Sequence, residues 1–397
     1  MPKLMPLAGT KEEKTVWRPV ESNFAKVLEA WPPERLEQLI AQATPEKVVR
    51  ALHQEYCSPE DLAAFLSPAA VPYLEDMARR AHRLTRQHFG RTIGLYVPLY
   101  LSNVCYSDCT YCFYGVASGG RGNRRTLSIS EIRIECQALA RHGFQSVLLL
   151  TGDAPKTAPL SYLAQAVRIA REYFPAVAVE VYALEEEKYR HLVAQGLEGV
   201  TLYMETYHRP TYAEVHRRGR KRDFDFRLGA LERAGRAGVR RLSLGALLGL
   251  YDWRCDGFWT ALHARYLQRE CWQSAIAVSF PRLRSAPPRH QIRYPVNDRE
   301  FVQLILALRL FLPEAGFNLS TRERAELRDR LIPLGITNMS AGSSTRPGGY
   351  ALSGEETLAQ FEVEDRRSPA EVAAAIRRAG YDPVWKDFDR AFYDDLS

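Results

Sequence analysis

Several features that mark other protein classes are missing from this chain of 397 residues. It has no run of about eighteen apolar residues, so no segment is predicted to span a membrane. Residues 1–18 lack an apolar core and contain Glu12 and Glu13, which does not fit a secretory signal. Cysteine is scarce: there are seven, an odd number, which argues against a disulfide framework. These absences predict a protein of the reducing cytoplasm.

The chain also lacks a strong charge of either sign. Its net charge of +7 is a mild basic excess that is spread along the sequence, which is typical of a solvated surface. We therefore expect neither nucleic acid nor a membrane as a partner. The densest basic run, residues 217–222, is predicted to be a solvated loop.

Three of the cysteines lie close together in the sequence. Cys105, Cys109 and Cys112 have the spacing C-x3-C-x2-C and follow an apolar and aromatic run, residues 94–101, that predicts a strand. A zinc site usually takes four ligands from paired C-x2-C motifs, and this chain has no second pair. Three thiolates on one loop suit a [4Fe–4S] cluster with one open iron. A zinc site completed by a histidine, or a chance group of buried cysteines, is the alternative.

From residue 94 the chain alternates between predicted strands and helices, which indicates an α/β fold with a parallel sheet. Eight strands predict a closed (β/α)8 TIM-type barrel, with its chemistry at the C-terminal ends of the strands. We expect a helical N-terminal region (1–93), the barrel (94–345) and a C-terminal extension that packs on it (346–397). The predicted strands are 94–101, 146–151, 177–183, 199–205, 240–246, 275–280, 316–321 and 336–341.

Polar side chains follow several of these strands. Arg322, after the seventh strand, has a planar fork that can hold a carboxylate by two oxygens, and the Ser/Gly turn that begins at Ser340 can add hydrogen bonds. The alternative for Arg322 is an ion pair with Glu323 or another acid. Glu205, at the end of the fourth strand, is costly to bury unless it is bonded, and its carboxylate suits ribose hydroxyls.

The cysteine spacing, with the aromatic Tyr111 before the last cysteine, resembles that of radical S-adenosylmethionine (SAM) enzymes. Within them, the chain resembles the aromatic amino acid lyases, in the segments 98–103, 108–112, 205–208, 278–284, 320–323, 347–350 and 384–387. The resemblance implies a [4Fe–4S] cluster, SAM, and cleavage of L-tyrosine to 2-iminoacetate and p-cresol for the thiazole moiety of thiamine. It also implies an electron donor such as flavodoxin or ferredoxin, and the thiazole synthase ThiG as a partner.

The resemblance also assigns residues to the cofactor. The three cysteines would bind the cluster, and Tyr111 would lie beside it. Gly152 and Asp153 would form the turn whose backbone receives the SAM amino group, with Asp153 where the family usually has Glu. Glu205 would bind the ribose, and Arg227 would pair with the SAM carboxylate.

For the substrate, the resemblance implies that Arg322 and Ser340 hold the carboxylate and that Tyr100 lies near the amine. One departure from the tyrosine lyases is Met204, where they usually have Gln.

Three other functions remain open. A tryptophan lyase of the NosL type shares the barrel and the carboxylate clamp, although residues 384–387 argue against it. The tyrosine lyase HydG binds a second cluster through C-terminal cysteines, and no cysteine follows Cys271 here. A cluster-binding regulator or electron carrier without turnover would have no use for the clamp. The remaining cysteines, which are isolated, are predicted to be buried thiols: Cys57, Cys136, Cys255 and Cys271.

Overall fold

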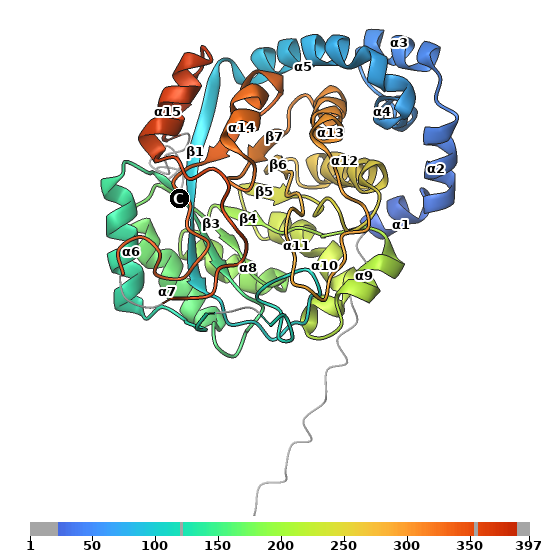
Figure 1. Ribbon diagram of the computed structural model, residues 1–397. Coiled ribbons are helices and arrows are strands. Elements are labelled where there is room, and N and C mark those ends of the chain that lie inside the picture. Colours follow the sequence, from blue (N-terminus) through green and yellow to red (C-terminus); the bar gives the residue numbers. More distant parts are fainter. Residues whose placement is uncertain (1–22, 120–121, 353–355, 387–397) are drawn as a thin grey trace, which may run out of the picture.

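The computed structural model describes residues 23–119, 122–352 and 356–386 (Figure 1). Eight parallel strands form one sheet in the order β2-β3-β4-β5-β6-β7-β8-β1, and β1 also pairs with β2, which closes the barrel. The predicted (β/α)8 fold is confirmed: β1 is longer than expected, β2 has the expected bounds, and β3 to β8 are shorter. The strands are β1 (Thr92–Ser102), β2 (Ser146–Thr151), β3 (Ala176–Glu180), β4 (Gly199–Thr201), β5 (Arg241–Leu244), β6 (Ala275–Ser279), β7 (Gly316–Leu319) and β8 (Asn338–Ser340).

Helices surround the strands on the outside (Figure 1). The sequence predicts one helix over 224–238, and the structure divides it at Gly229. None of the helices in the described residues combines the length and the apolar character that crossing a membrane requires. These outer helices are α6 (Ile129–Arg141), α7 (Leu160–Arg171), α8 (Glu186–Ala194), α9 (Arg209–Val215), α10 (Phe224–Leu228), α11 (Ala230–Arg236), α12 (Trp253–Glu270), α13 (Asp298–Phe311) and α14 (Ala325–Leu331), with short 3-10 turns at η2 (Arg220–Arg222) and η3 (Ile332–Leu334).

The N-terminal region packs against α12 and α13 from outside the barrel. The side-chain amide of Gln303, on α13, donates hydrogen bonds to the carbonyls of Phe65 and Ser67, at 2.9 and 2.8 Å. The expected loose arm over residues 1–20 lies outside the described residues. The helices of this region are α1 (Asn23–Glu29), α2 (Pro33–Ala41), α3 (Pro45–His53), α4 (Pro59–Leu66), η1 (Pro68–Tyr73) and α5 (Leu74–Phe89).

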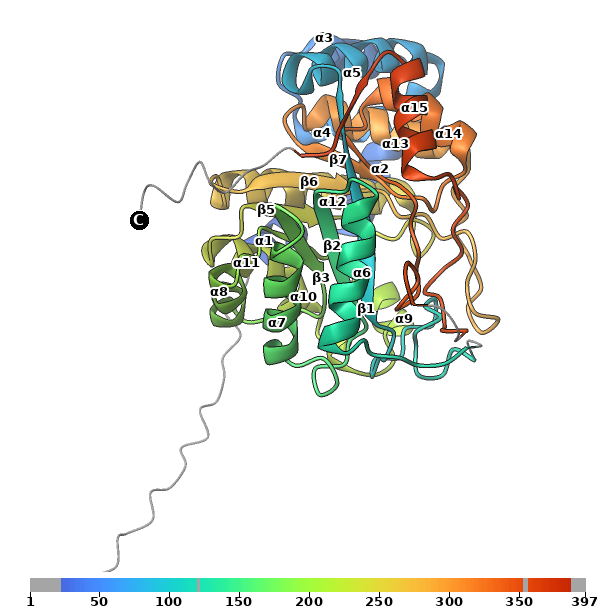
Figure 2. The same ribbon diagram turned by 90° about the vertical axis from the view of Figure 1, so that its left-hand side faces the viewer.

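The chain after β8 returns to the start of the barrel. Its helix α15 (Pro369–Arg378) lies at the same end of the molecule as α5 (Figure 2), and β9 (Asp382–Val384) pairs in parallel with the beginning of β1. The strand β9 was not predicted. Asp387, one of the residues of the family resemblance, lies outside the described residues. The division into domains at residues 93 and 345 stays a prediction.

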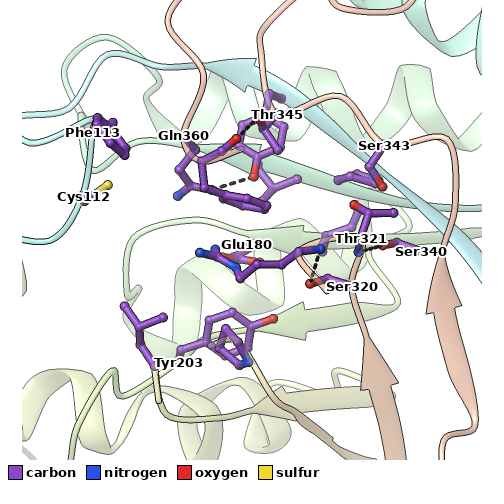
Figure 3. Close-up of a pocket in the computed structure, with 18 of the residues that line it drawn as sticks. Cys112, Phe113, Glu180, Tyr203, Ser320, Thr321, Ser340, Ser343, Thr345 and Gln360 are labelled. Carbon is purple, nitrogen blue, oxygen red and sulfur yellow. Dashed lines mark hydrogen bonds between the residues drawn. The ribbon is translucent and has the colours of Figure 1, made fainter. Parts of the chain in front are cut away.

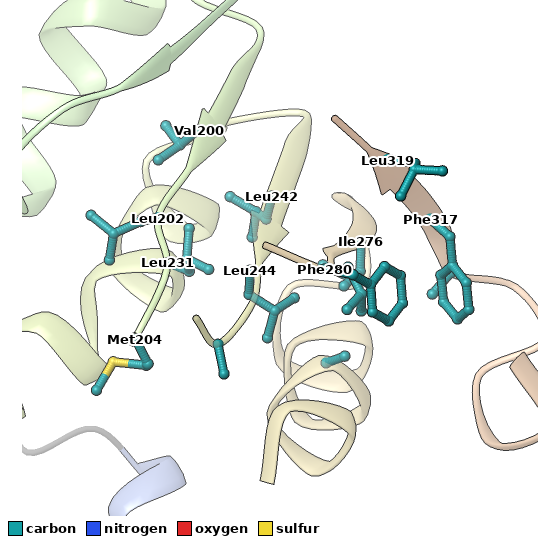
Figure 4. Packing of buried hydrophobic residues seen from close by; sticks show 14 of the residues in the cluster. Val200, Leu202, Met204, Leu231, Leu242, Leu244, Ile276, Phe280, Phe317 and Leu319 are labelled. Atoms are coloured by element: carbon teal, nitrogen blue, oxygen red, sulfur yellow. The ribbon is translucent and has the colours of Figure 1, made fainter. Parts of the chain in front are cut away.

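Side chains alternate along the barrel strands. Leu242 and Leu244 of β5 pack with Ile276 of β6 in the large apolar core, together with neighbours from β4 and β7 (Figure 4). Ser243, between the two leucines, instead bonds across the sheet: its hydroxyl lies 3.1 Å from that of Ser279 and accepts from the Asn318 amide at 3.0 Å. The strands therefore show opposite characters on their two faces, as the two-residue period of a strand requires.

Candidate functional site

The three clustered cysteines lie on the loop that leaves β1. All three line one cavity at the C-terminal ends of the strands, which we call the cofactor cavity. Cys109 is 5% exposed, and burial raises the pKa of its thiol to about 12 and that of Cys105 to about 11. The other residues of this cavity that the sequence assigns to the cofactor are Gly152, Asp153, Glu205 and Arg227, and Lys221 lines it as well.

The cysteine loop is held from the far side of the barrel mouth. Arg289, in the segment between β6 and α13, donates to the Asp108 carboxylate at 2.6 Å and to the Cys109 carbonyl at 2.9 Å. Beside it, the Thr110 hydroxyl lies 2.9 Å from a ring nitrogen of His290. The loop conformation is therefore fixed by contacts that are remote in sequence.

The residues present fit an open-iron cluster better than a zinc ion. In the described part of the chain, no three His, Cys, Asp or Glu side chains are arranged to bind a single metal ion. The nearby histidines are engaged otherwise, since His216 lies 2.9 Å from the Tyr111 hydroxyl and His290 contacts Thr110. A cubane binds each thiolate at a different iron, so its ligands are spread more widely than those of one ion. The zinc alternative therefore lacks a ligand set.

The turn after β2 packs directly on the cysteine loop. A Cβ atom on Gly152 would lie 2.2 Å from the Val104 carbonyl oxygen, so only glycine fits there. The Ser107 hydroxyl donates to one oxygen of Asp153. The other oxygen, Oδ1, is buried without a hydrogen-bond partner in the structure. Buried acceptors are normally satisfied, so this one fits a donor such as an ammonium group on a bound ligand.

Glu205 is held by two cations. Its carboxylate accepts a hydrogen bond from Lys221 at 2.5 Å and lies 3.5 Å from an Arg227 nitrogen. Its φ of 69° is the one positive value among the described non-glycine residues, and such strain persists where the surroundings over-determine the residue. Arg227 also donates to the Tyr203 carbonyl at 2.7 Å.

The basic run 217–222 is only partly a solvated loop. Arg217, Arg218 and Arg222 are exposed, as predicted. The prediction is wrong for Lys221, whose side chain is 16% exposed and turns inward to Glu205. The buried carboxylate of Glu205 is the physical reason, because an isolated charge there would be costly.

A second cavity opens in the barrel mouth beside the first, and we call it the substrate pocket (Figure 3). Arg322 lines it, with its guanidinium stacked 3.6 Å from the ring centre of Phe361. Burial lowers the pKa of this guanidinium. No carboxylate of the described residues lies within ion-pair distance of it. The alternative pairing with Glu323 is wrong, because Glu323 pairs with Arg282 and Arg284 instead.

Hydroxyl groups surround the same pocket. Ser340 of β8 is 2% exposed, and its hydroxyl accepts from the Thr321 amide at 3.1 Å. The hydroxyl of Ser343 is buried without a partner in the structure. Tyr100 donates to the Gln360 side chain at 2.6 Å, which brings a residue of the C-terminal extension into the barrel mouth.

Four lining residues were missed from the sequence. Glu180 is the last residue of β3, but the predicted strand ran on to residue 183, which hid its terminal position. Lys221 was hidden in a run of exposed basic residues. Gln360 and Phe361 belong to the irregular extension, where no local pattern indicates a role at the barrel mouth.

Comparisons with known proteins give the family. Residues 99–254 match the model of the Radical SAM superfamily, and residues 279–382 that of the Biotin and Thiamin Synthesis associated domain. The chain is 46% identical over 347 residues to the 2-iminoacetate synthase of Escherichia coli (strain K12), which covers 87% of this chain and 91% of that protein. The 2-iminoacetate synthase of Salmonella typhimurium is 45% identical over 347 residues, again 87% of this chain and 91% of that protein.

Solved structures agree with this. The hydrogenase maturase HydG superimposes with a TM-score of 0.83 at 32% identity, over 89% of this chain and 80% of HydG. Methylornithine synthase (PylB) superimposes with a TM-score of 0.69 over 88% of this chain and all of its own, and at 19% identity it supports the fold alone. By the extent and identity of these matches, the chain belongs to the 2-iminoacetate synthase family of radical SAM enzymes.

Proposed function

We propose that this protein is a radical SAM lyase that cleaves the Cα–Cβ bond of L-tyrosine. The products are 2-iminoacetate and p-cresol, with 5′-deoxyadenosine and methionine from SAM, and the imine supplies the thiazole moiety of thiamine. The observation that carries this proposal is a buried arginine, Arg322, which has no carboxylate partner among the described residues and lines a pocket that adjoins the cofactor cavity.

When bound, the [4Fe–4S] cluster and SAM would supply the radical chemistry that removes a hydrogen atom from the substrate amino group. Cys105, Cys109 and Cys112 hold the cluster. The remaining residues of the cofactor cavity hold SAM: the turn at Gly152 and Asp153 binds its amino group, Glu205 its ribose and Arg227 its carboxylate, while Tyr111 packs beside the cluster. The unsatisfied oxygen of Asp153 supports the first of these roles.

The substrate pocket positions tyrosine. Arg322 and Ser340 hold its carboxylate, because the fork of the guanidinium and the hydroxyl group can both donate hydrogen bonds to oxygen. Tyr100 lies beside the amine, with its own proton directed to Gln360, so that its oxygen faces the substrate as an acceptor. Fixing the substrate in this way supplies proximity, which is the main contribution a protein makes to a radical abstraction.

The partners follow from the reaction. An electron donor such as flavodoxin or ferredoxin reduces the cluster, and the thiazole synthase ThiG takes up the imine, which hydrolyses in water. We place these reactions in the cytoplasm.

Anaerobic turnover tests the proposal. The reconstituted enzyme, with SAM and a reductant, receives tyrosine or tryptophan, and the products are identified by mass. We expect p-cresol and glyoxylate, the hydrolysis product of the imine, from tyrosine. Cleavage of tryptophan without cleavage of tyrosine would contradict the proposal, and reactions without SAM serve as the control.

A further inference from the structure

The substrate pocket and the cofactor cavity share a small set of lining residues. Cys112, Glu180, Glu205, Lys221 and Gln360 line both. If the proposed function holds, the substrate hydrogen that reacts must face the cofactor while the carboxylate stays at Arg322. The α-amino group therefore lies at the boundary that these five residues form.

Four of the five already have a partner or a role. Cys112 is one of the three cluster cysteines. Lys221 and Glu205 form an ion pair at 2.5 Å, and the Gln360 oxygen accepts from Tyr100 at 2.6 Å. The side chain of Glu180 has no hydrogen bond or ion pair with any described residue, although its carboxylate can accept several hydrogen bonds.

The position of Glu180 follows from the fold. It ends β3, so its side chain stands at the C-terminal rim of the barrel, and Figure 3 shows it in the middle of the substrate pocket. The Glu180 carboxylate raises the pKa of the Arg322 guanidinium, and Arg322 lowers the pKa of Glu180, so the two charges lie close enough to interact. Because the amino and carboxylate groups of an amino acid share one carbon, their two partners must lie near each other.

The charges around Glu180 suit a proton acceptor. Burial and the nearby Glu205 together raise the pKa of Glu180 to about 7, although Lys221, Arg227 and Arg322 act in the opposite direction. The phenols of Tyr96, Tyr100 and Tyr203 line the same pocket. Burial raises the pKa of each above its ordinary value of 10, so these phenols stay protonated at neutral pH. Among these neighbours, Glu180 is the acid that changes its charge near neutral pH.

We propose that Glu180 binds the α-amino group of the substrate and accepts the proton that its ammonium form loses. An N–H bond of the ammonium breaks and an O–H bond forms on the Glu180 carboxylate. The substrate then carries a neutral amine and no electron is transferred. The substrate nitrogen is therefore a neutral NH2 group when the radical chemistry begins.

Ligand binding tests this assignment separately from turnover. The affinity of the anaerobic holoenzyme with SAM is measured by calorimetry for L-tyrosine and for 3-(4-hydroxyphenyl)propanoate, which lacks the amino group. In Glu180→Gln we expect tyrosine to bind at least about tenfold more weakly, equivalent to about 1.4 kcal/mol. The analogue should bind within about twofold of its wild-type affinity. Glu180→Asp, which keeps the charge, should recover part of the loss.

Glu37→Gln on α2 is the matched control, because it makes the same change outside both cavities. It should leave both affinities unchanged. Equal losses for tyrosine and the analogue in Glu180→Gln, or no loss for either, would overturn the assignment. The proposed function fails in a different way: wild-type enzyme would then neither bind nor cleave tyrosine.

Discussion

Arg322 differs from the other arginines at the barrel mouth in what surrounds its charge. Arg282 and Arg284 share Glu323, and Arg227 lies beside Glu205, whereas Arg322 faces an aromatic ring and a cavity. A buried cation without an acid partner is costly, and a bound carboxylate would compensate it. Among these barrel-mouth arginines, Arg322 is therefore the one that has no ion pair with a described carboxylate and faces the substrate pocket.

Replacing Arg322 should separate substrate binding from cofactor binding. We expect Arg322→Ala to lower p-cresol formation by about a hundredfold or more, at about 1.4 kcal/mol per tenfold. The variant should still bind SAM and cleave it slowly without tyrosine, as measured by 5′-deoxyadenosine formation. Arg322→Lys keeps the charge but loses the fork, so it should rescue only in part. Loss of SAM binding with intact tyrosine affinity would contradict this assignment.

The cluster assignment makes a prediction about iron content. After anaerobic reconstitution, the wild-type enzyme should contain about four irons per chain, the content of one cubane. Changing Cys105, Cys109 or Cys112 to Ala should abolish SAM cleavage, because each would remove one ligand. Cys255→Ala is the control, since this buried thiol lines neither cavity. About eight irons per chain would instead indicate a second cluster.

At the scale of elements, one carboxylate on α6 holds the start of the C-terminal extension. Glu135 is fully buried and accepts backbone N–H groups from Tyr350, Ala351 and Leu352, at 3.1, 2.7 and 3.1 Å. We expect Glu135→Ala to lower the free energy of unfolding by on the order of 2–3 kcal/mol, because it leaves these donors without an acceptor. Thermal unfolding measures the loss.

Glu135→Gln provides the comparison for that experiment. It retains an acceptor oxygen in place and should lose clearly less stability than the alanine variant. Limited proteolysis should cut Glu135→Ala faster than wild type within residues 346–368. Equal stability of the alanine variant and wild type would show that the extension is held by other contacts.

A second element-scale prediction concerns Asp256 in the first turn of α12. Burial raises the pKa of its carboxyl from 3.8 to about 8, although it accepts from Thr206 and from the Tyr207 amide at 3.0 and 2.9 Å. The native state then binds this proton more tightly than the unfolded state. Its contribution to stability is full below about pH 4 and falls as the pH rises towards 8.

Asp256→Asn should remove this pH dependence, because asparagine does not titrate and still offers an oxygen to Thr206 and Tyr207. We expect the unfolding midpoint of the variant to exceed that of wild type by roughly a few degrees at pH 8, and by less at pH 5. Parallel curves for the two proteins between these pH values would contradict the raised pKa of Asp256.

Elements with strong local patterns could be predicted from the sequence. The eight barrel strands are short apolar runs between helices, and a helix start such as the Ser128 capping box of α6 is a local pattern of this kind. The strand β9 escaped because it has only three residues, one of them Pro383, and forms by pairing with the distant β1. Glu180 escaped because the length of a strand depends on its neighbours in the sheet. Its partner strand β4, predicted to reach residue 205, ends at Thr201.

At the scale of the whole molecule, the site combines residues from most of the chain. The cysteine loop follows β1, the two cations that hold Glu205 come from η2 and α10, and Arg322 follows β7. The extension then returns to the mouth, where the Asn103 amide donates to the Leu358 carbonyl at 3.1 Å and Gln360 meets Tyr100. Such long-range closure leaves no periodic signal in the sequence, which is why the mouth was harder to predict than the barrel.

This arrangement has a consequence for how the protein is made. The ribosome adds Cys112 long before Arg289 and His290, which hold the cysteine loop, and before Leu358, which braces its start. At roughly 5–20 residues per second, the three thiols exist for many seconds without the contacts that fix their loop. In the growing chain the three thiols are therefore not yet held in the positions that bind a cluster. We expect iron and sulfide to be delivered to the finished, folded chain.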